Sequence, residues 1–359
     1  MRFFVKDFIE VHNPSIKRKD LEYVLESMIH DNLEYGVSAK TLETKLSERT
    51  GSKYCIALNS YYTAIDIVFE ALNLNEGDEI LIPSYTPSIY LDIILRRKLK
   101  PVVIDTAEKS YFPGIEQIQN AITDKTKVLI VIHNFGYTID CSGFTPLVPV
   151  VLEDITKVPG ALAGTKKSGE YGQYAISSFS STELITTGDG AGVFCSDKKD
   201  YQTLSKLIYE SATENESENL YQYKIHGLMP DINAAMGVSQ LSSLEKRLDL
   251  RKKIGSIYEE SLLKSRCSFI PSIDGCERYY ADFPFQIKSG LKDAIAFFKK
   301  NGVEVIKPYE KPIHHYLNLP KENYPNTEKL FLSSLLIPSG STLLKKDVEK
   351  ISKLLMAMI

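Results

Sequence analysis

Short apolar runs alternate with stretches of helical period along the first half of the chain. The apolar runs predict strands at residues 54–59, 79–83, 101–105, 127–134, 149–154, 174–180 and 192–196. Between them, at residues 63–72 and 88–97, apolar residues recur with the spacing of an α-helix. Continuous apolar strands separated by helices are typical of a mostly parallel sheet with both faces covered. We therefore expect a doubly wound α/β domain, in which ligands lie beyond the carboxyl ends of the strands.

The second half of the chain changes character. An acidic stretch at residues 210–218 predicts a solvated loop, and a long helical pattern runs through residues 231–264. The pattern then predicts an α+β portion with a strand at 283–287, helices at 291–301 and 346–358, and a turn-rich segment at 307–320. A chain of 359 residues is also longer than the ~250–300 residues at which single cores stop growing. We expect a large domain over residues 1–245, including an N-terminal helical segment, and a smaller C-terminal α+β domain over residues 246–359.

Composition supports a folded protein and narrows its partners. Hydrophobic residues make up 43% and charged residues 25% of the chain, which is enough apolar surface for an extensive core. The net charge of −3 provides no basic field that would attract nucleic acid or an anionic membrane. A small molecule or another protein is therefore the expected partner.

Cysteine usage and the lack of a long apolar segment predict a cytoplasmic protein. The five cysteines are odd in number and contain no CxxC pair, so neither a disulfide framework nor a zinc site is indicated. No segment approaches the ~18 consecutive apolar residues of a membrane-spanning helix. We expect reduced thiols and no membrane association.

Two local patterns resemble known sites but do not meet their requirements. The stretch from Gly160 to Ser168 has the wrong spacing for a phosphate-binding loop, which needs Lys directly after its second Gly. His314 and His315 suggest a metal site, but adjacent side chains point apart and no carboxylate has a suitable spacing in the sequence. A hydrogen-bonding role is expected for each histidine.

Eight signatures follow one another in an order that is specific to one family. They lie at residues 51–60, 76–86, 101–105, 122–128, 153–161, 178–190, 231–241 and 312–314. With them, nearly the whole chain resembles the DegT/DnrJ/StrS-type sugar aminotransferases, which are fold type I enzymes that use pyridoxal phosphate (PLP) on nucleotide-linked keto-sugars. The resemblance implies a homodimer with active sites at the subunit interface, and a role in making unusual sugars for polysaccharides or secondary metabolites.

The chain departs from this family at the residue on which its chemistry depends. The resemblance places the lysine that forms a Schiff base with the cofactor aldehyde at position 183, where this chain has Glu183. A carboxylate cannot form an imine, so the usual transamination is not expected from this chain alone.

Other positions of the implied cofactor site have changed as well. The small residues of the phosphate-binding cup are replaced by Ser60-Tyr61-Tyr62, so two phenol rings are expected to crowd it. The remaining replacements are Pro87 for a stacking aromatic, Lys157 for Gln or His, His226 for Asn and Leu228 for Arg.

Several residues match positions that, in the family, contact the cofactor or the substrate. Asp154 would pair with the pyridine nitrogen, and Ser178, Tyr62, Thr63 and His226 would surround the rest of the cofactor. The resemblance places two further residues near the substrate, Tyr309 and His314.

Three interpretations of Glu183 and Lys157 stay open. Our hypothesis is that the two form an ion pair at the position of the imine, because a buried charge is costly unless it is paired. Alternatively, Lys157 forms the imine itself. In the third interpretation Glu183 acts as general acid or base, as in the family's dehydratases, which use the aminated cofactor (PMP) and carry histidine in place of the lysine.

The expected function is that of a sugar-aminotransferase-like protein of nucleotide-sugar or polysaccharide biosynthesis in which standard transamination is lost. It would be a pseudoenzyme or a repurposed nucleotide-sugar-binding protein, and the alternative is a PLP- or PMP-dependent aminotransferase or dehydratase that uses Glu183 or Lys157. We expect no cofactor, with PLP or PMP as the alternative. The expected partner is a second copy of the chain, or a lysine-bearing homologue in a heterodimer.

Overall fold

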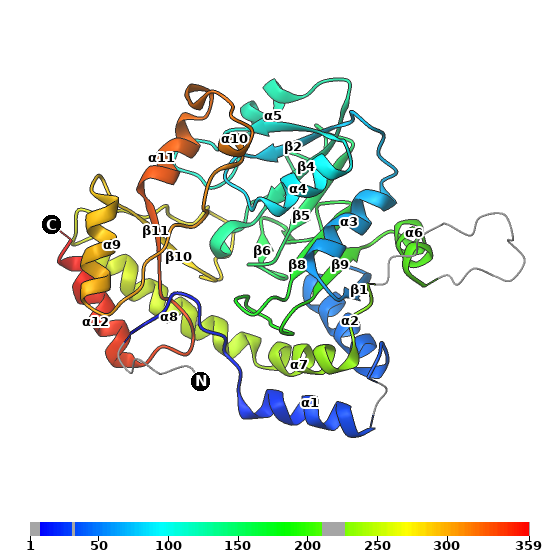
Figure 1. Ribbon diagram of the computed structural model, residues 1–359, viewed down its shortest axis with the longest axis horizontal. Helices are drawn as coiled ribbons and strands as arrows, with labels where there is room; N and C mark the ends of the chain where they lie inside the picture. Colours follow the sequence, from blue (N-terminus) through cyan, green and yellow to red (C-terminus); the bar gives the residue numbers. More distant parts are fainter. Residues whose placement is uncertain (1–7, 31–32, 210–226, 359) are drawn as a thin grey trace, which may run out of the picture.

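A seven-stranded sheet forms the centre of the protein (Figure 1). The computed structural model describes residues 8–30, 33–209 and 227–358. The strand order is β1-β9-β8-β5-β4-β2-β3, and β9 alone among these seven runs opposite to the others. The expected mostly parallel sheet is therefore confirmed. The strands are β1 (Tyr54–Leu58), β2 (Glu79–Pro83), β3 (Lys100–Ile104), β4 (Thr126–Ile132), β5 (Val150–Asp154), β8 (Tyr174–Ser178) and β9 (Ala191–Cys195).

Helices cover both faces of this sheet because alternate strand residues bury apolar side chains on each side. On one face, strand residues such as Ile56 and Ile80 pack against α3 (Tyr61–Ala71), α4 (Ile89–Arg96) and α6 (Lys198–Tyr209). On the other face, neighbours such as Ala57 and Leu81 pack against α2 (Val37–Thr50), α5 (Ile115–Ala121) and α7 (Asp231–Ser242). Helix α1 (Arg18–His30) lies along the outside of α7 (Figure 1).

A smaller unit is built around a two-stranded antiparallel sheet of β10 (Phe283–Gln286) and β11 (Ser334–Ile337). Its apolar core also receives side chains from α8 (Leu244–Leu262), α9 (Leu291–Lys300) and α12 (Lys345–Met356). The start of α8 packs in the core of the large sheet and its end packs in the small core. The other short elements are β6 (Leu162–Ala163), β7 (Lys166–Lys167), α10 (Ile313–Tyr316), α11 (Pro325–Ser333) and the 3-10 turns η1 (Asn134–Gly136) and η2 (Lys321–Asn323).

The structure corrects two details of the predicted elements. The helical pattern over residues 231–264 is two helices, because Ser243 between α7 and α8 has non-helical backbone angles while the apolar spacing continues past it. The segment 307–320 contains the one-turn helix α10. The predicted loop at residues 210–218 lies outside the described residues.

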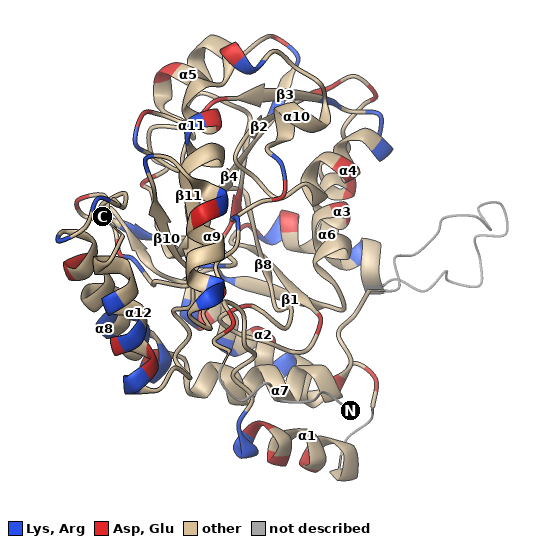
Figure 2. Ribbon diagram, turned by 60° about the vertical axis from the view of Figure 1, so that its left-hand side comes forward, with Lys and Arg blue, Asp and Glu red and all other residues tan. Residues whose placement is uncertain are grey.

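Charged residues of both signs are interspersed over the helices, as Figure 2 shows for α8 and α12. Within the described parts of the chain, no helix is both long enough and apolar enough to span a lipid bilayer.

Candidate active site

A cavity of about 340 Å³ lies at the carboxyl ends of the central strands. Ile132 at the end of β4, Asp154 at the end of β5 and Ser178 at the end of β8 all line it. This is the sheet edge at which the doubly wound pattern predicts ligands. Among the predicted site residues, the cavity brings together Asp154, Lys157, Ser178, Glu183 and Tyr309.

An ion network formed by one lysine and two carboxylates lies in this cavity. Lys157 Nζ is 2.8 Å from Glu183 Oε2, so the hypothesised ion pair is present. The same Nζ is 3.0 Å from Asp282 Oδ2, a contact that the sequence did not predict. Lys157 is thus held between two acids from distant parts of the chain.

The backbone around Gly136 places Asp282 in the cavity. Tyr279 N donates to Gly136 O at 2.8 Å, and Asp282 N donates to Phe135 O at 3.2 Å. Gly136 has a φ of +92°, and a Cβ there would lie 2.6 Å from Ala281 N. Glycine therefore permits both the turn after β4 and the close approach of the segment that carries Asp282.

Titration of the three charged groups follows from burial and from their mutual contacts. Burial acts to lower the pKa of Lys157, but Asp282 and Glu183 outweigh it and raise that pKa above its ordinary value. Burial raises the pKa of Glu183, although Lys157 opposes the rise. Burial also acts to raise the pKa of Asp282, but Lys157 outweighs it, so this pKa lies below its ordinary value. Lys157 is therefore an ammonium group at neutral pH.

The carboxylate of Asp154 is bonded by groups of its own chain. Tyr61 Oη donates to Asp154 Oδ2, and Tyr90 Oη donates to the same oxygen at 2.9 Å. Thr156 N donates to Oδ1 at 2.9 Å, and the Thr156 hydroxyl accepts a bond from Ser178 N at 2.9 Å. Asp154 has only 3% of its surface exposed, so these donors take the place of solvent.

The two residues predicted on the phosphate side form parts of α3 rather than a lining of the cavity. Thr63 N donates to the capping residue Ser60 at 3.1 Å, and the Thr63 hydroxyl donates to Asn59 Oδ1 at 3.2 Å. The ring of Tyr62 lies 5.8 Å from the guanidinium carbon of Arg96 and is not among the residues that line the cavity. Of the two phenols expected to crowd one cup, Tyr61 therefore lines this cavity and Tyr62 does not, because consecutive helical residues point in different directions.

The two predicted substrate residues lie in different environments. Tyr309 lines the cavity, where its hydroxyl donates to Asn134 Oδ1. His314 is fully buried outside it, with Nδ1 2.6 Å from Ser84 Oγ and Nε2 2.9 Å from Glu328 Oε1. A direct substrate contact by His314 is therefore not supported by its position.

The structure corrects the expectation that no carboxylate is suitably placed near the neighbouring His315. Its Nε2 contacts the same Glu328 oxygen as His314 does, so α11 supplies a carboxylate that the sequence spacing did not reveal. These contacts agree with the expected hydrogen-bonding role. The remaining predicted residue, His226, lies outside the described residues.

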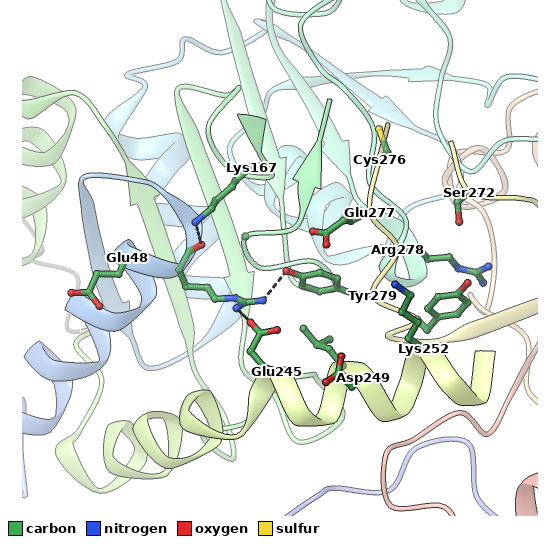
Figure 3. Close-up of a pocket in the computed structure, with 14 residues that line it drawn as sticks. Glu48, Lys167, Glu245, Asp249, Lys252, Ser272, Cys276, Glu277, Arg278 and Tyr279 are labelled. Atoms are coloured by element: carbon green, nitrogen blue, oxygen red, sulfur yellow. Dashed lines mark hydrogen bonds and ion pairs between the residues drawn. The ribbon is translucent and has the colours of Figure 1, made fainter. Parts of the chain in front are cut away.

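A larger hollow of about 640 Å³ lies elsewhere, between α2, α8 and residues 272–280 (Figure 3). Arg49 contacts Glu245 there, donates to Tyr279 Oη at 2.7 Å, and accepts a bond from Lys167 Nζ on its carbonyl oxygen at 2.9 Å. None of the predicted site residues that the structure describes lines this hollow, so the cavity at the strand ends is the better candidate.

The pyridoxal cofactor implied by the resemblance does not match the side chains in this cavity at two points. By family register, Glu183 stands where the aldehyde would need an amine, and Asp154, which would pair with the ring nitrogen, is already bonded by two phenols.

Comparison with known proteins gives a consistent family. The model of the DegT/DnrJ/EryC1/StrS aminotransferase family matches residues 14–356. A GDP-perosamine synthase of Caulobacter vibrioides is 25% identical over 96% of each chain. Among solved structures, a proposed sugar aminotransferase of Streptococcus pneumoniae in its PMP form has a TM-score of 0.90, with 21% identity over 98% of this chain and 97% of that one.

An Escherichia coli GDP-4-keto-6-deoxy-D-mannose-3-dehydratase with bound hydrated PLP has a TM-score of 0.84, at 18% identity over 97% of this chain and 99% of its own. At these identities the two structures establish a shared fold, while the family match extends over nearly the whole sequence. The chain belongs to the DegT/DnrJ/EryC1/StrS aminotransferase family.

Proposed function

We propose that this protein takes part in nucleotide-sugar or polysaccharide biosynthesis as a family member that does not transaminate. The observation that carries the proposal is the ion network, in which Glu183 and Asp282 hold Lys157 at 2.8 and 3.0 Å, at the position that family register assigns to the imine. Glu183 has no nitrogen with which to form a Schiff base.

Lys157 is unsuited to replace the missing lysine. An amine attacks an aldehyde only when it is deprotonated. The pKa of Lys157 is raised by its two carboxylate partners despite burial, so its amine stays protonated. Breaking both ion pairs to free it would also leave two buried carboxylates unpaired, which is costly.

The charges of the cavity also disfavour a phosphate-bearing cofactor. Among the described residues, Asp154, Glu183 and Asp282 contribute three carboxyl groups to its lining, and Lys157 contributes one ammonium group. Like charges repel strongly in a partly desolvated site. The cavity instead offers hydroxyl, amide and carboxyl groups beside the apolar surfaces of Pro87, Phe135 and Leu336. This mixture favours recognition of a polar, ring-shaped ligand such as a sugar, and we propose that a nucleotide sugar is bound without being aminated.

The dehydratase-like alternative has one observation in its favour. Glu183 lines the cavity, and burial raises its pKa, which is the property required of a general acid. Such a reaction would still need the aminated cofactor beside Asp154. We propose a homodimer as the assembly, with a heterodimer containing a lysine-bearing homologue as the alternative.

Borohydride reduction tests the proposal directly. The purified protein would be mixed with equimolar PLP, reduced with borohydride, digested and mapped by mass spectrometry. We expect no lysine modified to stoichiometry, and in particular none at Lys157. The double variant Tyr61→Gly/Glu183→Lys, which restores an amine and removes a phenol, is the positive control. Stoichiometric labelling of Lys157 in the unaltered protein would refute the proposal.

A further inference from the structure

Among the tyrosines that the structure describes, Tyr61 alone both lines the candidate cavity and bonds Asp154. It is the first residue of α3, directly after the capping Ser60, and its hydroxyl donates to Asp154 Oδ2. Its ring meets that of Tyr90 edge to face, with centroids 6.0 Å apart, and the two hydroxyl oxygens are 3.0 Å apart. Two helices thus deliver two phenols to one carboxylate oxygen.

Asp154 has few acceptor positions left for a ligand. Tyr61 and Tyr90 share Oδ2, and Thr156 N occupies a position on Oδ1 at 2.9 Å. Each carboxylate oxygen has about two lone-pair sites. A nearly buried carboxylate requires such donors, and here the chain supplies them itself.

Both phenols remain donors under physiological conditions. Burial, followed by the negative charge of Asp154, raises the pKa of Tyr61 and of Tyr90 well above the ordinary value. Neither hydroxyl therefore ionises near neutral pH, and the contact with Asp154 is not released by titration.

We propose that Tyr61 is an internal substitute for the pyridine nitrogen of the cofactor and closes the site to PLP and PMP alike. A protonated ring nitrogen would need to lie about 3 Å from a free carboxylate oxygen. The Tyr61 hydroxyl already occupies this position on Oδ2. The inference does not depend on the loss of transamination, because a chain without a Schiff base could still hold PMP noncovalently.

Removing the ring should reopen the site. Tyr61→Ala vacates the space of a phenol beside Asp154 and frees one acceptor position, while the Ser60 cap remains. Tyr62→Ala is the matched control, because it removes the same ring from the next residue, which faces Arg96 and not the cavity. Tyr61→Phe keeps the ring and removes the hydroxyl, so it separates occupied space from hydrogen bonding.

Calorimetric titration with PMP tests the proposal, because PMP has no aldehyde and cannot label lysines. We expect no binding at about 100 μM PMP by the unaltered protein, Tyr61→Phe or Tyr62→Ala, and at least tenfold tighter binding by Tyr61→Ala. PMP should also raise the melting temperature of Tyr61→Ala but not that of the others.

Stoichiometric PMP binding by the unaltered protein would overturn the proposal. Equal gains in PMP affinity in Tyr61→Ala and Tyr62→Ala would overturn it as well. If Tyr61→Ala does not fold, the titration of the unaltered protein still tests the closed site, because stoichiometric binding by it contradicts the proposal, whereas binding by Tyr61→Phe assigns the closure to the hydroxyl. These results are separate from borohydride labelling, which reports on the lysines alone.

Discussion

At the scale of single residues, one lysine holds two carboxylates whose titration is shifted in opposite directions. Burial raises the pKa of Glu183, whereas Lys157 outweighs burial and lowers that of Asp282. An acid whose pKa is lower in the folded protein than in the unfolded chain stabilises the fold at pH values above the unfolded pKa. This stabilisation is lost as the pH falls. An acid whose pKa is higher in the folded protein stabilises the fold at low pH, and this stabilisation is lost as the pH rises. The two acids should therefore respond oppositely to substitution.

Asp282→Asn should destabilise the protein by about 3 kcal/mol at pH 7, because removing one partner of a buried ion pair leaves charge uncompensated. The deficit should persist down to the unfolded pKa near 3.8 and shrink below it as Asp282 protonates in the folded state. Urea unfolding between pH 7 and pH 3 measures this. A deficit that does not change below pH 4 would contradict the pairing with Lys157.

Glu183→Gln should show the reverse trend. Above the unfolded pKa near 4.5 the parent loses stability as Glu183 is driven to ionise, and glutamine is not subject to this loss. The stability of Glu183→Gln relative to the parent should therefore improve between pH 4.5 and pH 7, while Lys157 keeps Asp282 as a partner. The same urea series provides the measurement, and a relative stability that worsens over this interval contradicts the raised pKa.

At the scale of secondary-structure elements, two close contacts each depend on a single residue, Gly136 or Asp231. Gly136 lets the segment carrying Asp282 pack against the turn after β4. Asp231 at the start of α7 accepts bonds from the N–H groups of Gly36, Ser38 and Ala39 at the start of α2, at 2.8 to 3.1 Å. Each contact joins parts of the chain that are distant in sequence.

Gly136→Ala should cost at least ~3 kcal/mol, from a strained positive φ and displacement of the chain at Ala281. Gly77→Ala is the matched control, because Gly77 has a φ of +86° but nothing lies within 4 Å of the position that its Cβ would take. The control should cost about 1 kcal/mol from backbone strain alone. Equal losses in the free energy of unfolding, measured with urea, would show that the close approach of the chain at Ala281 to Gly136 is unimportant.

Asp231→Ala should destabilise the protein by about 3 kcal/mol, because it removes a buried charged acceptor from three N–H groups. Ser60→Ala, which removes the single bond to Thr63 N, should cost about 1 kcal/mol. The two losses would be compared by urea unfolding at one pH. A smaller loss for Asp231→Ala than for Ser60→Ala would contradict the role assigned to Asp231.

The strands of the large sheet could be predicted to within about two residues because their apolar runs are short and bounded by polar residues. The break at Ser243 could not, because amphipathic spacing continues from α7 into α8. The ion pair of Lys157 with Glu183 followed from family register. Asp282 and the shared contacts of Glu328 arise from chain segments far apart in sequence, for which local patterns carry no signal.

At the scale of the whole molecule, the fold of the family is retained, and we propose that its cofactor chemistry is lost. The sheet, its helical layers and the cavity at the strand ends are present, and the family match covers residues 14–356. Within the cavity, Lys157 is held by two acids and Asp154 by two phenols. The central claim is that the assembled protein holds neither PLP nor PMP.

Native mass spectrometry of the protein purified from cells supplied with pyridoxine measures assembly and cofactor content together. The account predicts a dimer whose mass equals that of two unmodified chains, unchanged when PLP or PMP is added. A dimer that carries one PLP or PMP on each chain would contradict it.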